Sequence, residues 1–107
     1  MSIRTALTSV LALAAALPAL AEPSFNRIAS FPTAANMAEG EDRARPTSAE
    51  IMAVSEDGNM LVYSDSPLGA IGLVDITDPT RPAPLGNIAM EGEPTTTVIQ
   101  GGAAFVG

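Results

Sequence analysis

Apolar segments in the second half of the chain are short, and a turn sequence follows each of them. Four such segments cover residues 48–55, 60–64, 70–77 and 84–90. Segments of this length, bounded by turn residues, are typical of β-strands. The connections contain Asp-Gly, Pro and Gly, which favour tight turns and hairpins. The sequence therefore predicts an all-β fold with one antiparallel four-stranded meander between residues 48 and 90.

The inner segments of this meander carry apolar residues on both faces. In residues 70–77, Ile71 and Leu73 alternate on one face, while Val74 and Ile76 occupy the other. A sheet with one face in water would instead alternate apolar and polar residues, so we expect neighbouring layers on both sides. The fourth segment is more polar and is flanked by prolines, which predicts an edge strand.

Residues 22–47 have a different pattern and form a separate stretch. Residues 25–31 alternate in a way that predicts one short strand. Residues 32–46 follow neither a helical nor a strand period and contain several charges around Gly40, so we expect a long polar loop.

The strand pattern starts again after residue 90. Residues 95–100 and 103–107 correspond to the first two strand segments, and Gly101-Gly102 replaces the Asp57-Gly58 turn. The offset of 47 between Ile51 and Val98 lies in the range of β-propeller blades. We therefore expect residues 48–107 to form the first blade and a half of a β-propeller.

A complete propeller typically needs about four to eight blades. The propeller hypothesis therefore predicts that the chain is the N-terminal fragment of a longer protein, or a truncated reading frame. Two alternatives remain. The two hairpins can be alike by coincidence, or the chain can form a small independent β-sandwich.

Residues 1–21 have the organisation of a signal peptide. Arg4 precedes an apolar core, Pro18 ends it, and Ala19-Leu20-Ala21 supplies small residues for a signal peptidase. The apolar run is shorter than the roughly 20 residues of a membrane-spanning helix. We expect a signal-peptide helix that is cleaved after Ala21, and a periplasmic or secreted protein with no stable membrane anchor.

Charge and composition exclude several classes of function. Without the signal segment the chain has four arginines against 12 acidic residues, a net charge of −8. This surface repels phosphate backbones, so we expect no nucleic-acid partner. The sequence contains neither histidine nor cysteine, which excludes a Ser-His-Asp triad, a histidine-bound zinc and disulfides within the chain.

The run of residues 48–97 resembles the first blade of exported bacterial β-propellers with a phytase-like domain, the family called "esterase-like activity of phytase". The segment VDITDPTRP is also similar to the LVIVD-type repeat of surface propellers. The resemblance covers residues 25–107 and only the opening of such a domain. It implies a secreted or periplasmic propeller that hydrolyses phosphoric esters, and no catalytic motif of the family maps onto these positions.

Carboxylates in the loops are the candidate site. If the chain is a propeller, three of its connections share one rim, and these hold six acidic residues: Glu39, Glu41, Asp42, Asp65, Glu91 and Glu93. Loop carboxylates suit calcium, and bound calcium could attract a phosphate. The simpler interpretation is that these loops are polar because they are solvated.

Glu50 and Asp65 are the predicted metal ligands, with calcium as the possible cofactor. Glu50 is acidic at the start of an otherwise apolar innermost strand, where it could face the channel as a ligand or base. Thr97 is its counterpart in the half-repeat, so the two positions can also share a polar direction without chemistry. Asp75 and Asp78 are expected to accept hydrogen bonds from the turns that follow them.

Two functions fit this sequence. The first is a phytase-like propeller that cleaves phosphoric esters with the help of a metal ion. The second is a non-catalytic secreted or cell-surface propeller that binds partners. Propellers host both kinds of function, so the fold does not decide between them. Either a small phosphoester or a surface protein is therefore the expected partner.

Overall fold

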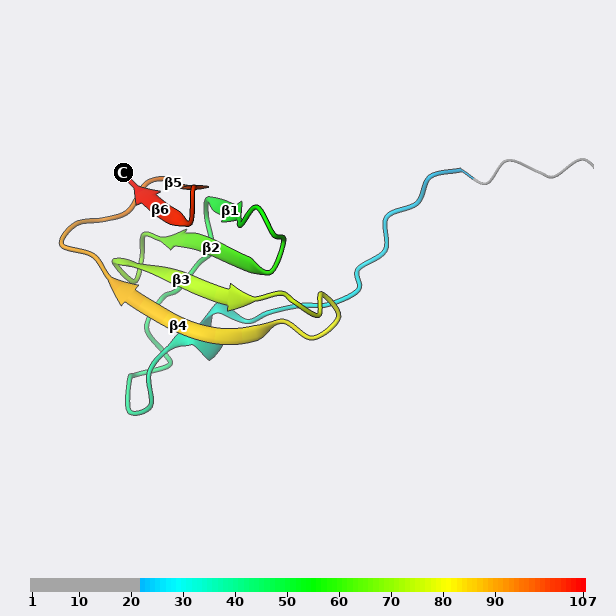
Figure 1. Ribbon diagram of the computed structural model, residues 1–107. Coiled ribbons are helices and arrows are strands. Elements are labelled where there is room, and N and C mark those ends of the chain that lie inside the picture. The colour runs from blue at the N-terminus through cyan, green and yellow to red at the C-terminus, as the bar shows by residue number, and fades with distance from the viewer. Residues whose placement is uncertain (1–21) are drawn as a thin grey trace, which may run out of the picture.

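A computed structural model describes residues 22–107 of the chain (Figure 1). The predicted signal-peptide helix and its cleavage site, residues 1–21, lie outside the described residues. Within residues 22–107, no helix has the length and apolar character needed to cross a membrane.

Four strands form one antiparallel sheet, joined in sequence order (Figure 1). They are β1 (Met52–Val54), β2 (Met60–Asp65), β3 (Ala70–Asp75) and β4 (Ala83–Ala89). Each strand pairs with the next one along the chain, and the register shifts once, between Leu73 and Val74 opposite β4. The predicted all-β meander is therefore confirmed, although β1 is shorter than the predicted segment of residues 48–55.

Short side chains and glycines shape the turns between the strands, as the sequence predicts. The Asp57 carboxylate accepts hydrogen bonds from Ser55 and from the Asn59 backbone, while Gly58 adopts a φ of 73°. Asp75 and Asp78 accept hydrogen bonds from backbone amides two residues later. The expectation that these aspartates stabilise turns is confirmed.

A second, two-stranded sheet follows the meander. It consists of β5 (Thr97–Gln100) and β6 (Ala103–Val106), which pair in an antiparallel hairpin. Gly101 and Gly102 form its turn with φ values of 57° and 75°, a conformation that glycine adopts without steric cost. The hairpin packs its β5 strand against β1 and β2 (Figure 1).

The core lies in the two central strands of the meander. Val62, Tyr63, Ile71 and Val74 are all at least 95% buried. Adjacent residues of β2 face opposite layers: Tyr63 contacts Asn36 from the N-terminal segment, whereas Val62 lines a cavity shared with the β5–β6 hairpin. The prediction that the inner strands are covered on both faces is confirmed.

The strand predicted over residues 25–31 is wrong, because these residues form no regular secondary structure. Phe25 and Ile28 are exposed. Residues 29–31 instead line an apolar groove together with Leu61 and Tyr63 on the face of the meander. A segment that lies against a face cannot use the backbone hydrogen bonds that an edge offers, so it does not become a strand.

The stretch predicted as a polar loop, residues 32–46, contains one short 3₁₀ helix, η1 (Thr33–Asn36). Its last residue, Asn36, and the following Met37 are both buried. The helix packs against β3 and β4 (Figure 1). This stretch is therefore a cover for one face of the sheet as well as a connection.

Candidate functional site

Three connections meet at the end of β2 where β2 turns toward β3. Thr47 and the Ser48 amide, from the segment before β1, donate hydrogen bonds to the Asp65 carboxylate. Ser66 lies within hydrogen-bonding distance of Glu50 and of the Pro94 carbonyl oxygen, which precedes β5. The loops that the propeller hypothesis places on one rim are thus in direct contact.

Asp65, one of the two predicted metal ligands, is a fully buried carboxylate. Its Oδ1 accepts hydrogen bonds from the backbone amides of Ser48 and Leu68, both at 3.1 Å, and its Oδ2 accepts one from the Thr47 hydroxyl. Buried carboxylates need such partners because desolvation of a charge is costly. In this arrangement Asp65 holds the start of β1 against the β2–β3 turn.

Glu50, the second predicted ligand, lies on the surface just before β1. Its backbone amide donates to the Ser64 carbonyl oxygen at 3.0 Å, which fixes the main chain. Its Oε2 lies 2.5 Å from the Ser66 hydroxyl, which is also 2.7 Å from the Pro94 carbonyl oxygen. A hydroxyl has one proton to donate, so Ser66 serves one of these two acceptors at a time. Glu50 is therefore the more accessible of the two predicted ligands.

Within residues 22–107, no group of three or more acidic, histidine or cysteine side chains is arranged to hold a metal ion. Glu50 is linked to Ser66, and Asp65 is occupied by its three donors. Calcium binding by Glu50 and Asp65 consequently stays a prediction.

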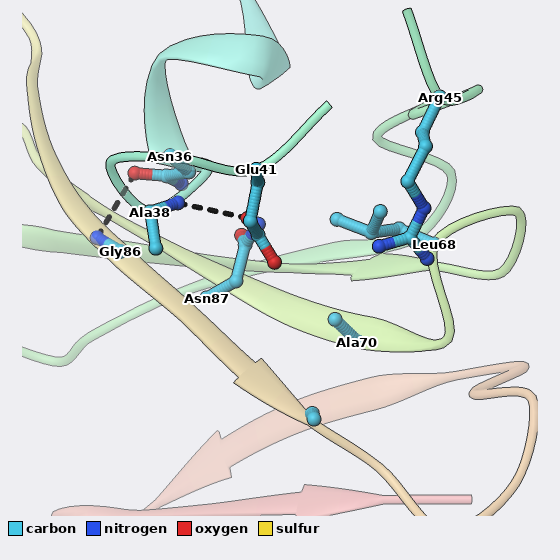
Figure 2. A pocket seen from close by; sticks show the side chains of 9 residues that line it. Asn36, Ala38, Glu41, Arg45, Leu68, Ala70, Gly86 and Asn87 are labelled. Atoms are coloured by element: carbon cyan, nitrogen blue, oxygen red, sulfur yellow. Dashed lines mark hydrogen bonds between the residues drawn. The ribbon is translucent and has the colours of Figure 1, made fainter. Parts of the chain in front are cut away.

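A cavity of about 350 Å³ opens between the loop of residues 38–45 and the β3–β4 side of the sheet (Figure 2). Glu41 and Arg45 reach toward the sheet from the loop, while Asn87 points up from β4 (Figure 2). Leu68, Ala70 and Ala89 supply an apolar part of the wall. The cavity thus joins one carboxylate, one guanidinium and one carboxamide to a small apolar surface.

Asn36 fixes the position of this cavity relative to the sheet. Its side-chain Nδ2 donates to the Tyr63 hydroxyl at 2.9 Å. Its Oδ1 accepts a hydrogen bond from the Gly86 amide at 3.0 Å, which Figure 2 shows. Asn36 thereby connects η1 with β2 and β4. Sequence reasoning missed this residue, since it lies 27 positions from Tyr63 and 50 from Gly86.

Tyr63 beneath this asparagine is almost completely buried. Desolvation raises the pKa of the Tyr63 phenol above its ordinary value of 10.0, the Asp65 charge raises it further, and the Asn36 hydrogen bond opposes both. The phenol therefore stays protonated at neutral pH and cannot act as a base there. Its role is to close the core over Gly72, where the ring leaves no room for a side chain.

Three hydrogen bonds stabilise the loop of residues 38–45. The Ala38 amide donates to Glu41 Oε2 at 2.8 Å, and the Ala44 amide donates to Asp42 Oδ1 at 2.9 Å. Arg43 donates to the Ala34 carbonyl oxygen at 2.9 Å. No described residue forms a hydrogen bond or ion pair with the Arg45 side chain, so its charge is available at the cavity.

Comparison with known proteins gives no relative for this chain: no family model, no curated protein and no solved structure matches it. The class that the structure defines is therefore its architecture alone, an all-β arrangement of two antiparallel sheets within residues 22–107. Its function has to be inferred from its own residues.

Proposed function

We propose that residues 48–107 form the opening blades of an exported β-propeller of the phytase-like kind, which hydrolyses phosphoric esters with the help of a bound metal ion. The observation that carries this proposal is the arrangement of the two sheets. A four-stranded meander is followed at once by a hairpin of the same pattern, and the first strand of that hairpin packs against the first two strands of the meander.

The contacts between loops support the same architecture. In a propeller, the connection between strands two and three and the connection between blades lie on one rim. The hydrogen bonds of Asp65 and Ser66 join the β2–β3 turn to the segments that precede β1 and β5. Contacts of this kind between connections at one end of the strands are what a propeller requires, and they support the proposal.

Glu50 is the side chain that we expect to bind the metal ion. It precedes β1 beside Ser66 of the β2–β3 turn, is exposed, and has one carboxylate oxygen, Oε1, without a hydrogen bond to the described residues. Calcium prefers such oxygen ligands and would offset the negative charge that otherwise repels a phosphate.

The test is phosphatase activity of the native exported protein toward a panel of phosphomonoesters, with calcium and after chelation. We expect activity that is lost on chelation and restored by calcium. Glu50→Gln should lower both activity and calcium affinity, whereas Glu56→Gln, in the turn at the other end of β1, should change neither. Absence of both hydrolysis and calcium binding in the native protein would refute the proposal.

The second candidate is a non-catalytic propeller that binds partners. The structural role of Asp65 favours this candidate, because all three hydrogen bonds of its carboxylate hold loops in place. If this candidate is right, Asp65→Asn will lower stability without changing affinity for calcium. The same pair of assays, calcium titration and phosphoester hydrolysis, therefore separates the two candidates.

A further inference from the structure

The cavity between the loop of residues 38–45 and β4 contains chemistry that the proposed function does not use. It is lined by one acidic and one basic side chain, Glu41 and Arg45, so its own charge sums to zero. Its volume of about 350 Å³ lies within the range of small-molecule sites, roughly 300 to 1,000 Å³. These are the features of a site for a small ligand that is itself neutral overall and carries both charges.

The two charged side chains differ in what they offer. The Glu41 carboxylate is oriented by the Ala38 amide, which donates to its Oε2 and leaves Oε1 as an acceptor. Arg45 forms no hydrogen bond or ion pair with the described residues, and its guanidinium can bind a carboxylate through two parallel hydrogen bonds. The pair is not joined in a salt bridge within the described part of the chain. One side of the cavity therefore accepts a cation and the other an anion.

Asn87 adds an independent observation at the base of the cavity. Both polar atoms of its side chain are buried, and neither has a hydrogen-bond partner. An unsatisfied buried amide is costly, and native proteins rarely retain one without a reason. The side chain points toward Glu41 (Figure 2), so a polar ligand group bound beside the Glu41 carboxylate would lie next to Asn87 and supply the missing partner.

The frame around these groups is built before any ligand arrives. Asn36 ties η1 to β4 through the Gly86 amide, and Arg43 ties the loop to η1 through the Ala34 carbonyl oxygen. A site that is already formed loses little conformational freedom on binding. The apolar wall of Leu68, Ala70 and Ala89 leaves space for an aliphatic group beside the charges.

From this geometry we propose that the cavity binds a free α-amino acid with an aliphatic side chain. Arg45 binds the carboxylate, Glu41 binds the ammonium group, and Asn87 completes the hydrogen bonds of the polar end. The aliphatic side chain lies against Leu68 and the two alanines. A phosphate or a simple carboxylate fits less well, because the Glu41 carboxylate repels any ligand that is only an anion.

Binding can be measured on the full chain by following the Gly86 amide and the Asn87 side-chain amide in ¹⁵N-resolved NMR titrations. The probes are L-leucine, acetate, methylammonium and inorganic phosphate. We expect saturable shifts with L-leucine, and affinities at least about tenfold lower for acetate and methylammonium, each of which offers one of the two charges. Tighter binding of phosphate than of L-leucine, or no binding of any probe, would overturn the proposal.

Two variants remove one charge each and keep the fold. Glu41→Gln retains an oxygen that accepts the Ala38 amide, and Arg45→Gln changes an exposed side chain. Each should weaken L-leucine binding about tenfold or more, since each removes one charged hydrogen-bond partner of the ligand. Arg81→Gln is the matched control, because this arginine lies in the β3–β4 turn and does not line the cavity. An equal loss in the control would overturn the assignment.

This inference does not depend on the proposed phosphoester hydrolysis. Absence of L-leucine binding to the full chain would leave the Glu50 proposal untouched, and failure of the calcium and phosphatase assays would leave the cavity proposal untouched. The two proposals can therefore fail separately.

Discussion

The meander and the hairpin that follows it have similar sequence patterns but very different burial. The last four residues of β2 are all buried, whereas every residue of β6 is exposed. Phe105 on β6 has 58% of its surface exposed, while Tyr63 on the corresponding strand has 1%. The difference arises because β2 lies between two strands and between two layers, and β6 pairs only with β5 among the described strands.

This comparison shows that the sequence pattern decides which segments become strands. The strands and layers packed around a segment decide which of its side chains are buried. The same contrast applies to polar groups. Ser64 is buried and lies within hydrogen-bonding distance of the Ile51 backbone, whereas the buried Thr97 hydroxyl on β5 has no partner in the described residues. The meander therefore behaves as the stable unit, and the hairpin as a layer that depends on contacts with it.

The largest expected effect comes from a substitution at the tight contact between Gly72 and the Tyr63 ring in the meander. Gly72→Ala would place a methyl group inside the Tyr63 ring position, so the ring must leave its site. We expect the free energy of unfolding to fall by about 3 kcal/mol or more. Chemical denaturation measures this. Gly92→Ala is the control, since nothing lies within 4 Å of a methyl group there, and equal losses in the two variants would contradict the packing described.

The next effect concerns the carboxylate that joins the loops. Asp65→Ala leaves three donors without their acceptor: Thr47, Ser48 and Leu68. We expect a loss of about 2 to 4 kcal/mol in unfolding free energy. Asp78→Ala removes an exposed turn carboxylate and should cost less than about 1 kcal/mol. Thermal or chemical unfolding in calcium-free buffer gives both values. A small loss of unfolding free energy for Asp65→Ala would argue against its role in holding the loops together.

A third pair of variants compares the two sheets directly. Val62→Ala removes a fully buried side chain from the meander and should cost about 2 kcal/mol. Phe105→Ala removes a larger side chain from an exposed strand and should cost less than about 1 kcal/mol. A larger loss for Phe105→Ala than for Val62→Ala, measured by denaturation, would mean that the hairpin is covered in solution.

The smallest effect depends on pH. Burial raises the pKa of Tyr63 above 10.0 in the folded state, so the fold binds this proton more tightly than the unfolded chain does. The resulting stability is present below pH 10.0 and is lost as the pH rises through the folded-state pKa. Tyr63 is the only tyrosine, and the chain has neither lysine nor cysteine, so no other side chain titrates there.

Unfolding experiments between about pH 9 and 11.5 measure this alkaline loss. Tyr63→Phe should remove it and should lower the unfolding free energy at neutral pH by about 1 kcal/mol, because the hydrogen bond to Asn36 is lost. An identical alkaline decrease in the variant would show that another group is responsible.

Much of the fold could be predicted from the sequence because its signals are local. Asp57-Gly58 and Gly101-Gly102 each specify a hairpin turn, and the short apolar segments around them specify the strands they connect. The prediction failed for residues 25–31, where the alternating pattern is present but residues 29–31 lie against a face of the sheet and pair with no strand. Alternation shows that a segment can form a strand, whereas pairing requires a partner.

The candidate site was less predictable, because it depends on groups that are distant in sequence. The sequence indicates Asp65 as an acid in a loop and Glu50 as an acid at the start of an otherwise apolar strand, but the burial of Asp65 follows from the packing of Thr47 and Ser48 against it. Asn87 and Asn36 carry no motif in the sequence. Their importance appears only when η1 and β4 are brought together.

The sequence by itself determined the strand order, the turns and the strong negative charge, because these depend on residue types and on neighbours along the chain. Tertiary structure decided that the Asp65 carboxylate is buried and joins loops, while Glu50 stays exposed. It also decided where Glu41, Arg45 and Asn87 meet around a cavity. The physical reason is that burial and the loss of water depend on which surfaces pack together, and surfaces from residues 36 and 86 meet only in the folded chain.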